Sequence, residues 1–100
     1  MSEESSDLWI EFEEGLGSKG KLRMMRVMIE KPSLTFTKYS LEKETKLKPV
    51  DVRTNLKILV ELGWVKEYPY QPKTYKINME KEIVKYFANF IEMVKRIQKL

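Results

Sequence analysis

The apolar positions of the 100-residue chain fall into short periodic groups separated by Gly, Pro and polar residues. Apolar side chains recurring every three or four positions predict helices over residues 6–16, 18–31, 37–45, 49–62 and 80–100. Residues 64–70 and 74–79 instead alternate apolar with polar positions and are rich in β-branched and aromatic side chains, which predicts a two-stranded hairpin. Residues 34–36 fit either a very short strand or an extended link.

Local start and stop signals support these boundaries. Pro32 ends the second predicted helix, because a proline ring is excluded from a helix interior. Thr37 is a candidate N-cap of the third helix, since its hydroxyl can accept an orphan backbone N–H. Pro49 suits the first position of the fourth helix, and Gly63 suits its C-terminal cap.

The same periodicity assigns the inward-facing positions of the helices. Each helix has one apolar stripe and an opposite polar face, as expected of an amphipathic helix on a small core. The predicted core positions are Leu22, Met25 and Ile29 in the second helix, Leu41 in the third, and Val52, Leu56, Leu59 and Leu62 in the fourth.

Composition removes several classes of function. The chain has no His and no Cys, which excludes a histidine base, a thiol nucleophile, a disulfide and a zinc–thiolate site. The acids and lysines form no recognisable catalytic spacing, so we expect neither an enzyme nor a bound metal or cofactor. No apolar run approaches the roughly 20 residues of a membrane span, and the start of the chain is acidic, unlike a signal peptide. We therefore expect a cytoplasmic protein without a membrane partner.

Charge is distributed unevenly along the chain. Residues 1–17 carry six acids and no base, whereas residues 18–78 carry 14 Lys or Arg and six acids. Residues 79–100 carry five bases and three acids. The basic central part fits a polyanionic partner, and it equally fits a solvated, lysine-rich surface.

The order helix, short strand, helix, turn, helix and hairpin over residues 21–79 resembles the winged helix-turn-helix family, in particular small archaeal and bacterial regulators of the ArsR and MarR type. The most telling stretch is residues 47–65, LKPVDVRTNLKILVELGWV, which is similar to the recognition helix of that family and the entry to its wing, the β-hairpin. In the tight turn before this helix, Lys46 stands where the family usually carries Gly.

The resemblance implies an α+β fold with three parts. Residues 1–17 would form an acidic N-terminal helical segment, residues 18–79 the winged helix-turn-helix domain (a three-helix core plus a β-hairpin wing), and residues 80–100 a long C-terminal dimerisation helix.

The resemblance also implies binding to double-stranded DNA. On the recognition helix, Arg53 could bridge two acceptors of guanine, Thr54 could bond a base or a phosphate, and Val50 could meet a thymine methyl group. Basic residues around them suit phosphates, although they could also be ordinary solvated side chains. The predicted contacts are Lys48, Pro49, Val50, Arg53, Thr54 and Lys57 on the recognition helix and Lys66, Gln71, Lys73 and Lys76 on the wing.

The last predicted helix carries an apolar seam. Its large side chains are spaced four, three, four and three residues apart, which is a heptad pattern typical of helix pairing. We expect self-association rather than folding of the whole seam onto its own domain. The predicted dimer interface is Ile83, Phe87, Phe90, Ile91, Val94 and Ile97, with Trp9 and Phe12 beside it.

These expectations combine into a homodimeric transcriptional regulator that binds a near-palindromic site on the nucleoid, because two-fold symmetry presents two recognition helices to the duplex. Two alternatives stay open: an architectural protein that binds DNA without sequence preference, and a winged-helix module for protein–protein interaction. An apolar pocket for a small-molecule effector at the dimer interface would leave no sequence signature.

Overall fold

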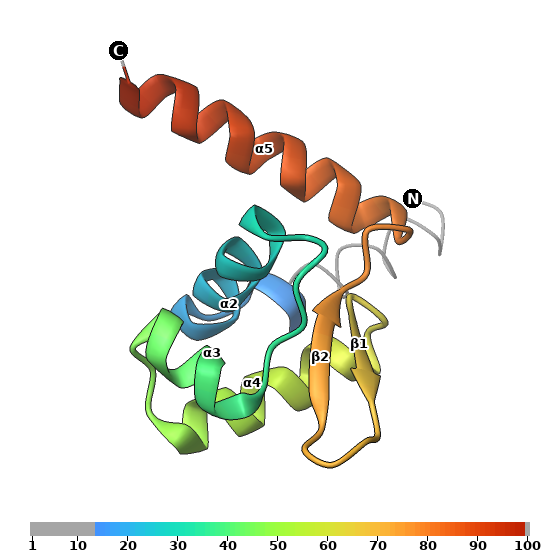
Figure 1. Cartoon of the computed structure of the whole chain (residues 1–100). Helices are drawn as coiled ribbons and strands as arrows, with labels where there is room; N and C mark the ends of the chain where they lie inside the picture. Colours follow the sequence, from blue (N-terminus) through green and yellow to red (C-terminus); the bar gives the residue numbers. More distant parts are fainter. Residues whose placement is uncertain (1–13, 100) are drawn as a thin grey trace.

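The computed structural model describes residues 14–99 of the chain. Its elements, in order, are α2 (Lys19–Glu30), α3 (Lys38–Thr45), α4 (Pro49–Glu61), β1 (Val65–Tyr68), β2 (Thr74–Ile77) and α5 (Glu82–Lys99). In Figure 1, α2, α3 and α4 pack together, the hairpin stands beside α4, and α5 crosses above α2. The described chain is therefore α+β, and the predicted order of helices and strands is confirmed within residues 14–99. The helix predicted over residues 6–16 lies largely outside the described residues, as do Trp9 and Phe12.

The caps read from the sequence form as expected. The Thr37 hydroxyl accepts a hydrogen bond from the N–H of Ser40 at 3.0 Å, and the Ser40 hydroxyl accepts one from the N–H of Thr37 at 2.9 Å. This reciprocal pair satisfies two donors at the start of α3. Pro49 occupies the beginning of α4, and Gly63 follows the helix with a φ of +79°, a conformation that glycine adopts without strain.

The two strands pair antiparallel, with Val65 opposite Ile77 and Tyr68 opposite Thr74. Phe36 adds an isolated bridge to Tyr75, and their two backbone N–H···O distances are both 2.7 Å. The segment over residues 34–36 is therefore an extended link that contributes one strand-like contact to the edge of β2. This contact ties the start of α3 to the hairpin.

The core lies where α2, α4 and the hairpin meet, and it includes Trp64, the largest of the fully buried side chains. Most of the predicted inward positions of α2, α3 and α4 are buried. Leu62 is only partly buried at the end of α4. The prediction is wrong for Leu22, which is 46% exposed. Met24 and Met28 take the inward positions instead, because α3 and α4 both pack against α2 and widen its buried face beyond one narrow stripe.

The apolar seam of α5 is divided by the fold. Ile83, Phe87 and Ile91 are buried against the rest of the described chain, together with Val84, which the heptad pattern did not include. Phe90, Val94 and Ile97 stay exposed. Ile83, Phe87 and Ile91 therefore pack within the domain. Of the predicted seam, only Phe90, Val94 and Ile97 can contact a partner in this conformation.

Candidate nucleic-acid interface

The exposed face of α4 is the first component of the candidate site. Burial of Val52, Leu56 and Leu59 turns the opposite side of the helix outward. All six side chains predicted on this helix are exposed: Lys48, Pro49, Val50, Arg53, Thr54 and Lys57. No described element covers Arg53 or Lys57, so an approaching ligand can reach them.

The turn between α3 and α4 fixes how that face is presented. Thr45, 2% exposed, donates its hydroxyl hydrogen bond to the carbonyl of Leu41. The same hydroxyl oxygen accepts a bond of 3.3 Å from the N–H of Leu47. Lys46 lies between them in the left-handed region, with φ 60° and ψ 26°. The position that the sequence marked as unusual for lysine therefore does adopt the conformation that favours glycine.

Basic side chains from three separate elements surround one hollow of about 390 Å³ beside α4. Lys38 comes from the first turn of α3, Arg53 and Lys57 come from α4, and Lys73 comes from the loop between β1 and β2. We call the hollow that these four residues line the basic hollow. Lys38 was missed from the sequence, because its place in the hollow depends on the packing of α3 on α4 and on the Phe36–Tyr75 bridge, which holds the start of α3 beside β2.

Two carboxylates, Glu61 and Glu67, share the hollow with the four cations. Glu67 is engaged with the buried Tyr75: burial, with the charge and hydrogen bond of Glu67, raises the pKa of the Tyr75 phenol above 10.0. Cations outnumber anions in the hollow, which therefore favours an anionic ligand.

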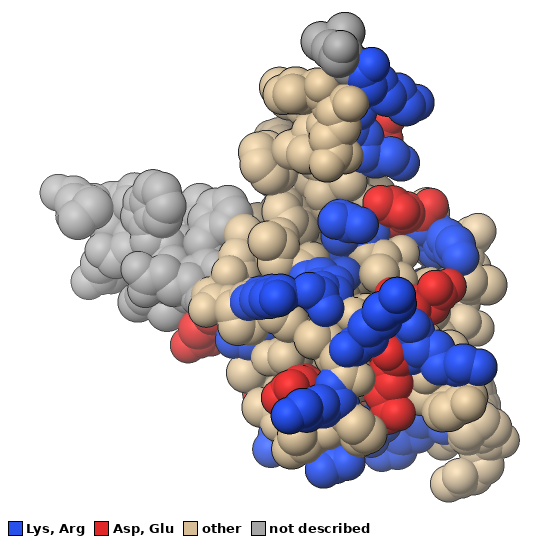
Figure 2. All heavy atoms as spheres, turned by 90° about the vertical axis from the view of Figure 1, so that its left-hand side faces the viewer, with Lys and Arg blue, Asp and Glu red and all other residues tan. Residues whose placement is uncertain are grey.

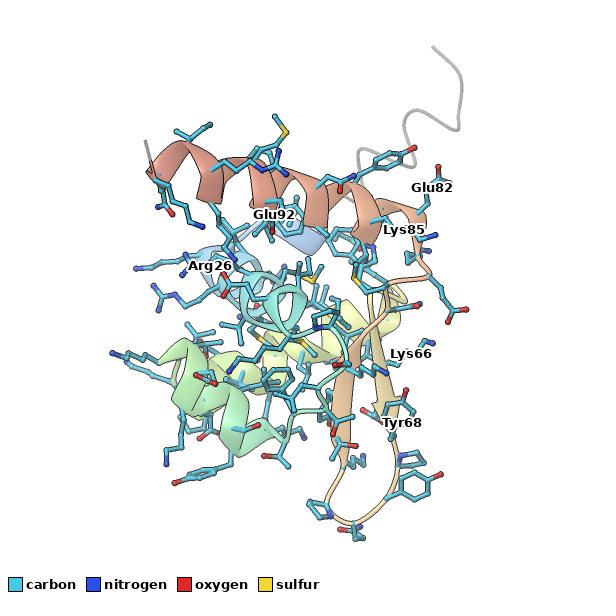
Figure 3. The ribbon with its side chains drawn as sticks, turned by 45° about the horizontal axis from the view of Figure 1, so that its top comes forward. Arg26, Lys66, Tyr68, Glu82, Lys85 and Glu92 are labelled. Atoms are coloured by element: carbon cyan, nitrogen blue, oxygen red, sulfur yellow. The ribbon has the colours of Figure 1, made fainter. Side chains whose placement is uncertain are left out.

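The other predicted hairpin residues lie elsewhere. Lys66 and Lys76 line a different hollow with Pro32 and Ser33, and Figure 3 shows Lys66 pointing outward from the hairpin, away from α3 and α4. The Lys66 ammonium forms an ion pair of 2.7 Å with Glu80. The hydrogen bond to Glu80 and its charge raise the pKa of Lys66, and the same contact lowers the pKa of Glu80. Gln71 is exposed in the loop near Lys73.

A second concentration of bases lies on the side of the molecule formed by α2 and the C-terminal half of α5. Figure 2 shows Lys and Arg side chains spread over this side, with acids scattered among them. Lys19, Arg23, Arg26 and Lys95 line a groove between the two helices. The floor of the groove is apolar, with Leu22, Phe87, Phe90, Ile91 and Val94.

Comparison with known proteins leaves the chain without an assigned family. No protein-family model matches it, and no curated protein matches it significantly.

Within residues 14–99, no group of three or more acidic, His or Cys side chains is arranged to hold a metal ion. In the same part of the chain, no helix combines the length and the apolar character needed to cross a bilayer.

Proposed function

We propose that the protein binds double-stranded DNA, with α4 in the major groove and the hairpin against the flanking backbone. The observation that carries this proposal is the basic hollow, in which Lys38, Arg53, Lys57 and Lys73 converge from three elements onto the exposed side of α4. Basic residues that serve only to keep a surface hydrated need not lie close together. Here four of them, from positions far apart in the sequence, line one hollow beside α4.

The dimensions and chemistry suit a duplex. An α-helix with its side chains is about 10–12 Å across, and the major groove is about 12 Å wide. In this binding mode Arg53 bridges the O6 and N7 atoms of guanine, Thr54 meets a base or phosphate, and Val50 contacts a thymine methyl group. Lys38, Lys48, Lys57 and Lys73 neutralise phosphates on either side of the helix.

The proposal includes the fold family. In this interpretation α2, α3 and α4 form the helix-turn-helix core, the β1–β2 hairpin is the wing, and Phe36 adds one strand-like contact to the edge of β2. The left-handed turn at Lys46 and the cap at Thr37 support it. The protein would then act as a sequence-specific transcriptional regulator in the cytoplasm, bound to a near-palindromic site as a homodimer.

An architectural role is the second candidate, favoured by the bases that lie away from α4. Lys19, Arg26 and Lys95 flank the groove between α2 and α5, and none of them lines the basic hollow. Bases spread over several faces suit a protein that coats or bridges duplexes without reading their sequence, because phosphates alone supply non-specific affinity.

Binding to random genomic fragments, followed by sequencing of the retained DNA, tests the proposal. A regulator enriches one motif and binds it more tightly than random duplex by a factor of about 10³ or more. An architectural protein retains all fragments with a steep salt dependence. Absence of duplex binding even at low salt would overturn both and leave a protein–protein interaction module.

A further inference from the structure

The groove between α2 and α5 has an apolar floor that is open to solvent in the described part of the chain. It encloses about 380 Å³. Leu22, Phe90 and Val94 line it and are 46%, 55% and 37% exposed, although all three are large apolar side chains. Covering such a floor with another apolar surface is favourable, because it removes apolar area from water. An exposed floor of this kind therefore indicates a docking site.

The walls of the groove carry bases with little to neutralise them. Within residues 14–99, neither Lys19 nor Lys95 forms an ion pair. Arg26 makes a 3.7 Å contact with Glu30, the one carboxylate among the lining residues. Arg23 donates through one terminal nitrogen to a backbone carbonyl of α3, and its guanidinium has further donors. The groove therefore fits an occupant that combines apolar side chains with several carboxylates.

The groove is about as long as three turns of helix. Its lining residues run from Lys19 to Glu30 on α2 and from Phe87 to Gln98 on α5. Each wall is therefore about 16 Å long, at about 1.5 Å per residue. An amphipathic helix bound in a groove places its anchoring side chains over a similar length, at spacings of three, four and seven residues. The dimensions therefore suit a peptide segment that lies along the groove.

We propose that residues 1–13 of the same chain occupy this groove. The segment is both apolar and acidic, and it contains no base. Its second half carries the large apolar residues Leu8, Trp9, Ile10 and Phe12, and its acids are Glu3, Glu4, Asp7, Glu11 and Glu13. The negative charge of the segment complements the walls of the groove, and its apolar residues match the floor.

The order of residues in the segment matches the cross-section of the groove. The sequence predicts a helix here, in which Leu8, Trp9 and Phe12 share one face. At about 100° per residue, Glu11 and Glu13 fall on opposite sides of that face. The groove has the same arrangement, with the apolar floor between bases of α2 on one wall and a base of α5 on the other. Each flank of the docked face therefore brings a carboxylate to a basic wall.

The segment is attached close to the groove and is long enough to fill it. Glu14 follows the segment and lies in a hollow with Lys21, in the first turn of α2, whose first residue, Lys19, lines the groove. The 13 residues before Glu14 cover about 20 Å as a helix and about 43 Å when extended, against about 16 Å for the groove. A tethered segment also has an effective concentration on the order of 1 mM, so a few contacts suffice to hold it.

Docking determines which bases of the protein are free to meet nucleic acid. The carboxylates of the segment engage the bases of the groove, so a duplex has to displace them before it binds there. The basic hollow beside α4 stays open, which favours binding through α4 over the coating of duplexes. The inference rests on the proposed function in this respect only, because the docking itself needs no DNA. Measurements on the free protein therefore separate failure of docking from failure of DNA binding.

Quenching of tryptophan fluorescence by acrylamide tests the docking in the full chain. The chain has two tryptophans, and Trp64 is 1% exposed, so Trp9 reports on the segment. Trp9→Phe gives the emission of Trp64 alone, for subtraction. We expect Trp9 to be quenched much less than in a free peptide of residues 1–13, at every protein concentration. Quenching equal to that of the peptide overturns the proposal. Protection that is lost on dilution places the segment on a second copy of the chain and also overturns it.

Substitutions in the groove test where the segment docks. Leu22→Glu places a charge on the floor, and Arg26→Glu reverses a charge of the wall; both side chains are exposed, so the core stays intact. With unchanged circular dichroism, we expect Leu22→Glu to raise the quenching of Trp9 to the level of the peptide and Arg26→Glu to raise it in part. Leu34→Glu is the matched control, because Leu34 is 45% exposed and lies outside the groove. Protection of Trp9 that survives both groove variants overturns the proposal.

DNA binding tests the shielding of the groove. The double variant Trp9→Ala, Phe12→Ala removes two apolar anchors of the segment without changing the net charge of the protein. We expect it to bind random duplex more tightly than wild type does. The slope of log affinity against log salt concentration should steepen by about two or three units, as the bases of the groove become free for phosphates. An unchanged affinity and slope would show that the segment does not shield these bases, and would overturn this part of the proposal.

Discussion

Arg23 on α2 donates a hydrogen bond of 3.0 Å to the backbone carbonyl of Thr45, the last residue of α3. The bond joins the first helix of the three-helix core to the turn that precedes α4. It satisfies one of the orphan carbonyls at the end of α3. The Arg23 guanidinium therefore takes part in holding the fold together.

Replacing Arg23 with Met keeps most of the apolar stem and removes the guanidinium. We expect Arg23→Met to lower the free energy of unfolding by about 1–2 kcal/mol, because the Thr45 carbonyl loses a charged donor. Urea denaturation measures the change. Arg26→Met is the control: Arg26 is exposed and makes only a 3.7 Å contact with Glu30, so its effect should stay within about 0.5 kcal/mol. Equal losses in both variants would contradict a specific role for the Arg23 bond.

Lys46 is strained by its left-handed backbone. We expect Lys46→Gly to raise the free energy of unfolding by about 0.5–1 kcal/mol, since removal of the Cβ clash outweighs the added entropy of the unfolded chain. Thermal or urea unfolding gives the value. Lys85→Gly, in the exposed interior of α5, should instead lower stability by about 1 kcal/mol. A loss of stability in Lys46→Gly would show that the lysine side chain contributes more than its strain costs.

Arg53 is the proposed reader of a base. Arg53→Ala should weaken binding to the selected motif by about 1–3 kcal/mol while changing affinity for random duplex much less. Fluorescence anisotropy with both duplexes measures the difference. Arg53→Lys keeps the charge but loses the two-pronged contact, so it should also lose discrimination. If Arg53→Lys retains full specificity, Arg53 contacts only phosphate.

Lysine variants can show which face of the hairpin contacts DNA. Lys38 and Lys73 line the basic hollow, whereas Lys66 lies in the hollow on the other side. Lys38→Ala and Lys73→Ala should each reduce the salt slope of DNA binding by about one unit, because each removes one phosphate contact. Lys66→Ala should leave the slope unchanged, since Lys66 is paired with Glu80 in a different hollow. The affinity of all three variants for one duplex, measured over a range of salt concentrations, gives the three slopes. The same loss in Lys66→Ala would place the DNA across the other face of the hairpin.

The Lys66–Glu80 pair predicts a defined pH window. The pKa of Glu80 is lowered from 4.5, so its contribution to stability is present above that pH and is lost as the pH falls through its lower folded value. The pKa of Lys66 is raised from 10.5, so its contribution is lost as the pH rises through its higher folded value. A double-mutant cycle with Lys66→Met and Glu80→Gln should give a coupling at pH 7 that vanishes at both extremes. A coupling that persists in strong acid would contradict this assignment. Both side chains are exposed, so added salt should weaken it.

The sequence alone determined the local structure. The Thr37 cap, the start of α4 at Pro49 and its end before Gly63 follow from interactions within a few residues of each other. The spacing of Val52, Leu56 and Leu59 determined which side of α4 is buried, and so which residues it exposes. These predictions succeeded because a helix has a fixed period and its ends have fixed hydrogen-bonding needs.

Only the tertiary structure decided which distant residues share a face. Lys38 joins Arg53 and Lys73 because the Phe36–Tyr75 bridge holds the start of α3 beside the hairpin, whereas Lys66 turns to the other side. On α5 the domain covers Ile83, Phe87 and Ile91 and leaves Tyr86, Phe90, Met93 and Ile97 exposed. Periodicity shows that a helix has an apolar side; how much of that side its own domain buries depends on the packing of segments far apart in the chain.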